Sequence, residues 1–120
     1  MFELTKDFRF EAAHTLERAI GAEGSRRVHG HSYRAEISVK GTPDPKSGMI
    51  VDLGLFEQSL AAVRDQLDHH FLNDVSGVGP ATLENLALWI WGALVQAGIT
   101  PSRVVVARDA AGESCAYTGP

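Results

Sequence analysis

Two segments of the chain alternate between apolar and polar residues with a period of two, which is typical of strands with one buried face. The first segment ends at His14, and the second runs from about Ser32 to Gly41. Pro43 and Pro45 follow the second segment, and proline cannot donate a hydrogen bond to a strand ladder. The apolar positions are Phe2, Leu4, Phe8, Phe10, Ala12 and His14 in the first segment and Tyr33, Ala35, Ile37 and Val39 in the second.

The pattern then changes to steps of three and four, which predicts two amphipathic helices. Asp52 is the expected N-cap of the first helix, which should fray near residues 68–70. The second helix should start near Thr82, and Gly98 is its expected stop. The two apolar stripes hold Leu53, Phe56, Leu60, Val63 and Leu67, and then Leu83, Leu86, Ile90 and Leu94.

The last part of the chain predicts a strand over residues 104–106, a turn over 109–112 and a short strand over 114–118. The order of elements is therefore strand, strand, helix, helix, strand, strand. This order favours the α+β class, with a four-stranded antiparallel sheet.

Composition narrows the functional classes without naming one. A chain of 120 residues with a net charge of -4 fits one domain, here residues 1–120, and offers no broad attraction for nucleic acid. No stretch approaches the roughly 18 apolar residues of a membrane span, and the first ten residues lack a signal-peptide core. Cys115 is the only cysteine, which excludes an internal disulfide and suits a reducing compartment. We therefore expect a cytoplasmic protein with no membrane or nucleic-acid partner.

Three histidines form a candidate metal site. His29 and His31 share one strand parity with Tyr33, and His14 closes the first strand on its apolar parity. If the two strands pair antiparallel without a bulge, the three side chains converge at one end of the sheet. Three imidazoles with an open fourth position are typical of a catalytic Zn²⁺ site. The alternative is three histidines that are satisfied by backbone groups and water.

Several other titratable residues have both a catalytic and a structural interpretation. Asp68 next to His69 could form a proton shuttle, because a carboxylate fixes a histidine tautomer and raises its basicity. The same pair could simply occupy a helix C-terminus, where the dipole favours histidine. Glu84 in a first helical turn could complement the helix dipole, and Asp109 could stabilise a turn.

A series of short motifs resembles one family over nearly the whole chain. The motifs are F-x-F-E-A-A-H at 8–14, H-G-H-S-Y at 29–33, G-M-I-V-D-L at 48–53, L-D-H-H-F-L-N-D at 67–74, T-L-E-N-L-A at 82–87 and C-A-Y-T-G at 115–119. In this order they resemble the 6-pyruvoyltetrahydropterin synthase and 6-carboxytetrahydropterin synthase family. The resemblance implies the tunnelling fold, with two helices on one face of the sheet, and trimers that stack into homohexamers with active sites at subunit interfaces.

The resemblance also implies a role for each candidate residue. His14, His29 and His31 would bind zinc, which holds the side-chain oxygens of a pterin substrate, dihydroneopterin triphosphate. Asp68 and His69 would transfer protons. Asp109, together with Thr82 and Glu84 at the start of the second helix, would hold the pterin ring. The implied reaction eliminates triphosphate, and the carboxy-forming branch also loses acetaldehyde and leads to queuosine.

The sequence departs from the family pattern at three positions. Ser25 occupies the place of the catalytic cysteine, four residues before the first histidine of H-G-H. A serine hydroxyl is far less acidic than a thiol and is a poor base without strong activation, for example by His69. Asp109 replaces a glutamate, and Leu83 stands where the family has threonine or serine. Ser25 also differs from the glutamate of relatives that cleave the side chain in an aldolase-like way.

Three functional hypotheses follow from these residues. The first is a divergent zinc-dependent pterin enzyme whose standard lyase activity is weak or lost. The second is a non-catalytic pterin-binding or regulatory protein on the same fold. The third sets the family aside and predicts a small zinc hydrolase with His69 as its base.

Overall fold

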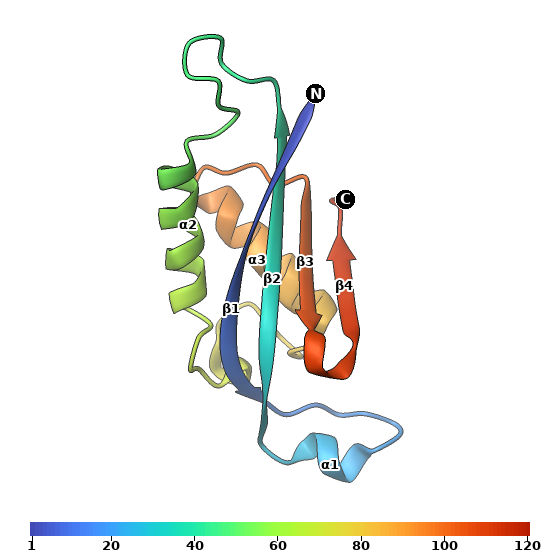
Figure 1. Ribbon diagram of the computed structural model, residues 1–120. Helices are drawn as coiled ribbons and strands as arrows, with labels where there is room; N and C mark the ends of the chain where they lie inside the picture. Colours follow the sequence, from blue (N-terminus) through green and yellow to red (C-terminus); the bar gives the residue numbers. More distant parts are fainter.

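An antiparallel sheet in the order β1-β2-β3-β4 is the framework of the protein, for which a computed structural model describes residues 1–120 (Figure 1). Helices α2 and α3 lie side by side against one face of this sheet, so the molecule has two layers. The strands are β1 (Phe2–His14), β2 (His29–Gly41), β3 (Arg103–Arg108) and β4 (Glu113–Tyr117). The helices are α1 (Ala22–Arg26), α2 (Leu53–Asp65) and α3 (Leu83–Gln96), with short 3-10 turns η1 (Leu72–Asp74) and η2 (Asp109–Ala111).

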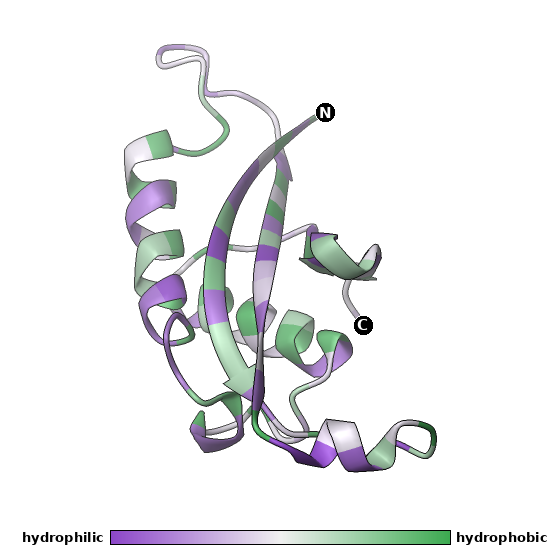
Figure 2. Cartoon of the chain, turned by 60° about the horizontal axis from the view of Figure 1, so that its bottom comes forward, coloured by the Kyte–Doolittle hydropathy of each residue, from purple (hydrophilic) through white to green (hydrophobic).

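The first two strands form one continuous ladder without a bulge. It runs from the pair Phe2 and Gly41 to the pair His14 and His29, over the whole length of both strands. An uninterrupted ladder preserves the alternation of faces, so residues of one parity stay on one side from end to end. The period-two pattern of the sequence is therefore confirmed, and Figure 2 shows hydrophilic and hydrophobic positions alternating along both strands.

The buried face of the sheet packs against the apolar stripes of α2 and α3. Phe10 and Tyr33 are each 1% exposed, and their rings stack with centroids 4.8 Å apart. The helices contribute most of the predicted stripes, including Phe56, Leu60, Leu86 and Ile90, all 2% exposed or less, whereas Leu53 at the start of α2 is 52% exposed. This core supports the end of the sheet that carries the three histidines.

Both predicted helix starts are confirmed by their capping hydrogen bonds. The Asp52 carboxylate accepts from the backbone N–H of Leu55, and the Thr82 hydroxyl accepts from that of Asn85. These bonds satisfy N–H groups that have no partner inside the helix. Gly98 has a φ of 87°, the left-handed conformation that ends α3 two residues after Gln96.

The structure confirms the α+β class and corrects several details. A single parallel bridge joins Phe71 to Ala13, so a fifth, one-residue strand segment accompanies the four predicted strands. Helix α1 adds a third helix, which the sequence did not predict because its five residues are too short for a periodic pattern. No helix combines the length and apolar character that crossing a membrane requires.

Candidate metal centre

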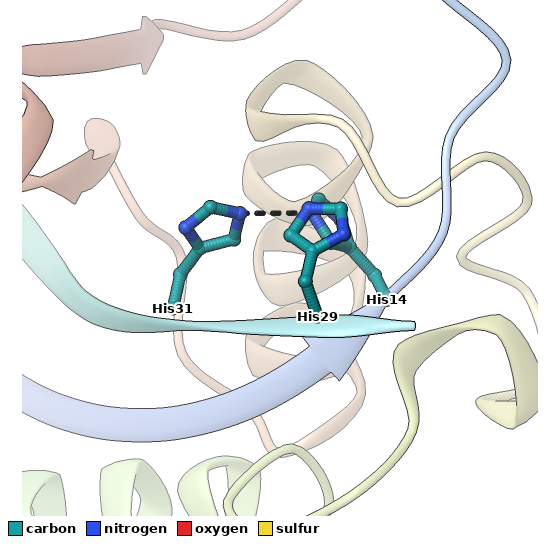
Figure 3. Close-up of side chains that lie close together, drawn as sticks. All are labelled: His14, His29 and His31. Atoms are coloured by element: carbon teal, nitrogen blue, oxygen red, sulfur yellow. Dashed lines mark hydrogen bonds between the residues drawn. The ribbon is translucent and has the colours of Figure 1, made fainter. Parts of the chain in front are cut away.

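The strand register brings three histidines together at one end of the sheet. His14 pairs directly with His29, and His31 lies two residues further along β2, opposite Ala12. Side chains two residues apart on a strand point to the same face, so all three imidazoles meet on one side (Figure 3). Their potential ligand nitrogens all lie within 4.8 Å of one another. The predicted convergence of His14, His29 and His31 is therefore present.

Two of the imidazoles have their outer nitrogen fixed by a backbone carbonyl. His14 Nδ1 lies 2.9 Å from the oxygen of Ala81, and His29 Nδ1 lies 2.8 Å from the oxygen of Arg27. A carbonyl can only accept, so each Nδ1 carries the proton, and in the neutral ring each Nε2 presents its lone pair to the cluster. Metal-binding histidines are oriented by contacts of this kind.

The inner nitrogens are arranged in a way that fits a cation. His31 Nε2 lies 3.0 Å from His14 Nε2 and also 3.2 Å from Nη1 of Arg108, which can only donate. With His31 Nε2 accepting from Arg108, the 3.0 Å contact places two unprotonated nitrogens side by side, and His14 Nε2 has no donor. A metal ion that took the place of the Arg108 donor could bind both nitrogens, and three histidines are a donor set that suits Zn²⁺.

The surroundings also keep the His14 and His31 rings neutral. Burial lowers the pKa of His31 to about 4, with further contributions from Arg108 and the other two histidines. Burial likewise lowers the pKa of His14, although its contact with the Ala81 carbonyl acts in the opposite direction. Because only the neutral imidazole binds a metal, these environments favour ligation near neutral pH.

Ser25 lies in the same cavity as the three histidines, a space of about 280 Å³. It is 5% exposed, and it belongs to α1, in the segment that connects β1 to β2. Its hydroxyl donates to the carbonyl of Ala22 at 2.9 Å and accepts from the backbone N–H of Arg18 at 3.4 Å. Both partners are backbone groups, so the structure provides no side chain that takes the hydroxyl proton.

The Asp68–His69 contact forms as predicted, but in a turn after α2 rather than in the helix, which ends at Asp65. Asp68 Oδ2 lies 3.0 Å from His69 Nδ1 and also accepts from Arg64. The backbone N–H of Glu11 binds Oδ1 and is the main reason that the pKa of Asp68 lies below its usual range. His69 has a φ of 59° and its side chain is 79% exposed.

The two predicted catalytic groups are not brought together within one chain. His69 lines a second cavity, of about 340 Å³, and Ser25 is not among the residues around it. His31 borders both cavities. The suggested activation of Ser25 by His69 therefore has no direct hydrogen bond to support it.

The predicted ring-binding residues are dispersed. Thr82 caps α3 and lines a third cavity of about 610 Å³, while Glu84 is exposed in the first turn. Asp109 lies outside the histidine cavity, where Arg34 binds both its oxygens at 3.0 and 3.2 Å and Arg9 adds a contact at 3.3 Å. Arg34 is the main reason that the pKa of Asp109 is lowered. These contacts occupy the carboxylate that was expected to meet a ring.

Arg108 and Glu113, two residues of the histidine cavity at the β3–β4 hairpin, were not among the candidates of the sequence analysis. Arg108 ends β3 and pairs across the hairpin with Glu113, the first residue of β4. The strand pattern could have identified Arg108 as an inward-facing residue, because it has the same parity as the buried Val104 and Val106. Apart from this parity, nothing in the sequence distinguishes Arg108 from an ordinary exposed basic residue at the end of a strand.

The fold and the histidine cluster define a class of protein: a two-layer α+β domain with three histidines at the end of its sheet that could hold a metal ion. Comparison with known sequences makes this specific. The family described as 6-pyruvoyl tetrahydropterin synthase matches residues 3–120, and the chain belongs to this family.

Individual relatives agree with this assignment. A 6-carboxy-5,6,7,8-tetrahydropterin synthase from Synechocystis is 34% identical over 100% of this chain and 95% of its own length. A putative enzyme of the same name from Archaeoglobus fulgidus is 30% identical over 83% of this chain and 82% of its own. The structure of Caenorhabditis elegans 6-pyruvoyl tetrahydropterin synthase, 23% identical, shares the fold with a TM-score of 0.87 over 99% of this chain and 96% of that chain.

Proposed function

We propose that this protein is a divergent, zinc-dependent lyase of the pterin-synthase type, with weak or absent triphosphate-eliminating activity. It binds a pterin-type substrate at His14, His29 and His31 and acts in the cytoplasm, in tetrahydropterin or queuosine biosynthesis. The observation that carries the proposal is the set of converging nitrogen lone pairs, next to a cavity that also contains Ser25. The names of the relatives supply the substrate class.

In this proposal the bound metal supplies Lewis acidity toward oxygens of the pterin side chain. The chain itself provides the three neutral imidazoles and the carbonyl contacts that orient two of them. Asp68 holds His69 in one orientation through the 3.0 Å contact to Nδ1, which leaves Nε2 free to exchange protons. Thr82, Glu84 and Asp109 are assigned to the pterin ring in the assembled protein.

The step that we expect to be slow is the removal of a proton from the substrate by the residue at position 25. A thiol with an ordinary pKa near 8.5 can be ionised by nearby cations, whereas a serine hydroxyl needs an adjacent base. The Ser25 hydroxyl instead donates to the Ala22 carbonyl, which has no basicity to offer. Positioned acid–base groups contribute about 10²–10⁴-fold to a rate, so the loss of one predicts a deficit of that order.

Triphosphate release from dihydroneopterin triphosphate tests this proposal. We expect the Ser25→Cys variant of the zinc-loaded protein to be faster than wild type by about 10²-fold or more, in line with the usual contribution of acid–base groups. Ser25→Ala is the matched control and should equal the wild type, because the wild-type hydroxyl does no chemistry. Rapid wild-type turnover that Ser25→Ala abolishes would contradict the assigned deficit.

A non-catalytic pterin-binding protein is the second candidate, favoured by the purely backbone partners of Ser25 and by its separation from His69. It predicts that calorimetry detects pterin binding while no product forms, even with saturating substrate. Elemental analysis separates the two candidates further. Stoichiometric zinc in carefully prepared protein supports the lyase, and protein that binds pterin without zinc supports the binding function.

The separation of Ser25 and His69 also favours an assembled site. We include in the proposal that the protein forms trimers that stack into a homohexamer, so that groups from neighbouring subunits complete each cavity. Light scattering of the full chain should then give a mass near six times 12.9 kDa. A monomer at micromolar concentration would remove this part of the proposal.

A further inference from the structure

Arg108 has an unusual position for a cation, since it lies against a candidate metal ligand. Its Nη1 donates to His31 Nε2 at 3.2 Å, and its Nη2 forms an ion pair with Glu113 Oε1 at 3.1 Å. The side chain is only 16% exposed, and its Nε is buried without a hydrogen-bond partner. The guanidinium is thus held in place from the Glu113 side and directed at the histidine cluster.

The contact between Arg108 and His31 is incompatible with metal ligation by the same nitrogen. His31 Nε2 has one lone pair in the neutral ring, which can accept from Arg108 or bind a metal, but cannot do both. When a metal takes this lone pair, Nη1 loses its acceptor and a guanidinium faces a cation at short range. An unpaired, partly buried donor of this kind is costly, and an oxyanion close to both charges removes the cost.

The charges around the cavity agree with such a ligand. Its lining includes Arg108 and Arg18, and its single carboxylate, that of Glu113, already pairs with Arg108. The three imidazoles add no negative charge. A ligand bound here therefore meets an excess of positive charge, which rises further when a metal is present.

We propose that Arg108 is an oxyanion-binding residue that exchanges partners, from His31 in the metal-free protein to an anionic oxygen of the ligand in the metal-loaded protein. This inference rests on the proposed function, because it assumes that the three histidines bind zinc. It identifies Arg108 as a residue that selects ligands with a carboxylate or phosphate oxygen next to the metal. Glu113 is its positioning partner.

The exchange predicts two effects of opposite sign from one substitution. Arg108→Met removes both the competitor for His31 and the repelling charge, so zinc should bind more tightly to the free protein. Contacts around metal ligands typically change metal affinity by about 10–100-fold, and we expect an increase of about tenfold. The same substitution removes the oxyanion donor, so anionic ligands should bind more weakly.

Competition with a chromogenic chelator measures the zinc affinity, and calorimetry on the zinc-loaded protein measures the ligands. The probes are pterin-6-carboxylic acid, 6-hydroxymethylpterin and inorganic triphosphate. Wild type should prefer the carboxylate over the alcohol by about tenfold or more, as expected for a charge-assisted hydrogen bond, and Arg108→Met should reduce this preference to within about threefold. If the oxyanion is instead a phosphate, triphosphate binding shows the loss in Arg108→Met and the carboxylate preference is absent from wild type.

Arg18→Met is the matched control, because it removes the same charge from the same cavity while the Arg18 side chain forms no hydrogen bond to a histidine. It should leave zinc affinity and carboxylate preference within about threefold of wild type, since no direct hydrogen bond is lost. Equal effects of the two substitutions would overturn the inference by showing a general charge effect. Arg108→Lys keeps the charge without the planar fork, so it should fall between Arg108→Met and wild type, and it serves as the test if Arg108→Met does not fold.

The outcomes also separate this inference from the proposed function. Wild-type protein that binds zinc and pterins, with Arg108→Met identical to it in both measurements, would overturn the role of Arg108 and leave the proposed function intact. Wild-type protein that binds neither zinc nor any pterin would overturn both.

Discussion

The candidate metal ligands and the candidate reaction groups are held in place in two different ways. The histidines lie on the β1–β2 ladder, where thirteen consecutive residue pairs fix their spacing. Ser25 lies in the five-residue helix α1 and His69 lies in the turn after α2, and each is held by a few local contacts. The ladder end is also supported by the core, since Tyr33 packs against both His14 and His31.

This difference indicates which parts of the site can diverge independently. A change in a ladder residue alters pairing and core packing together, so the geometry of the three histidines is tied to the stability of the sheet. A change at Ser25 alters a five-residue helix that takes no part in the β1–β2 ladder. A chain can therefore keep the arrangement for a metal while the group that moves a proton changes.

The largest expected effect comes from removing the aromatic support beneath the histidines. Phe10→Ala should lower the free energy of unfolding by about 3–5 kcal/mol, the usual cost of deleting a buried phenylalanine. Urea denaturation measures this loss, and zinc titration should show weaker binding because Tyr33 loses its stacking partner. Phe2→Ala is the control on the same strand and parity. Phe2 is 64% exposed, so its removal should change stability by less than about 0.5 kcal/mol.

Removing the N-cap of α3 should have a smaller effect on the free energy of unfolding. Thr82→Ala removes the hydroxyl that accepts from the Asn85 N–H at 3.1 Å and should cost about 1 kcal/mol in the same urea experiment. Thr82→Ser keeps the acceptor and should restore most of the loss. Zinc affinity should stay unchanged in both variants if the ladder alone positions the histidines. A fall in zinc affinity in Thr82→Ala would contradict the view that the β1–β2 ladder positions the histidines independently of the segments between elements.

The same distinction explains how much the sequence alone could predict. The convergence of His14, His29 and His31 followed from strand parity, because the ladder has no bulge and a period of two is enough to place each side chain. The caps at Asp52 and Thr82 followed from local chemistry. Helix α1 could not be predicted, since its five residues include Gly24 and depend on packing that a short pattern does not encode.

The environments of single residues were the least predictable feature. Arg108 belonged to the buried parity but was overlooked as a strand end, and its contact with His31 joins residues 77 positions apart. Asp109 lies one residue beyond it and was expected to bind a ring. The turn at η2 instead directs Asp109 toward Arg34, a cross-sheet contact that depends on the turn conformation rather than on alternation.

The smallest predicted effect concerns Asp109 and separates its two interpretations. Because Arg34 lowers the folded-state pKa below the usual 3.8, the carboxylate stabilises the fold above that value and loses this contribution as the pH falls through the lowered pKa. Asp109→Asn should therefore reduce the urea midpoint slightly at pH 6, and the difference from wild type should disappear at pH values below the lowered pKa. Its pterin affinity should fall if the carboxylate also binds the ring in the assembled protein, as proposed, and should stay at the wild-type level if the carboxylate serves only Arg34 and Arg9. A variant with unchanged acid stability and strongly weakened pterin binding would instead place Asp109 among the ring-binding groups, and would show that residues outside the histidine cavity of one chain contribute to the site in the assembled protein.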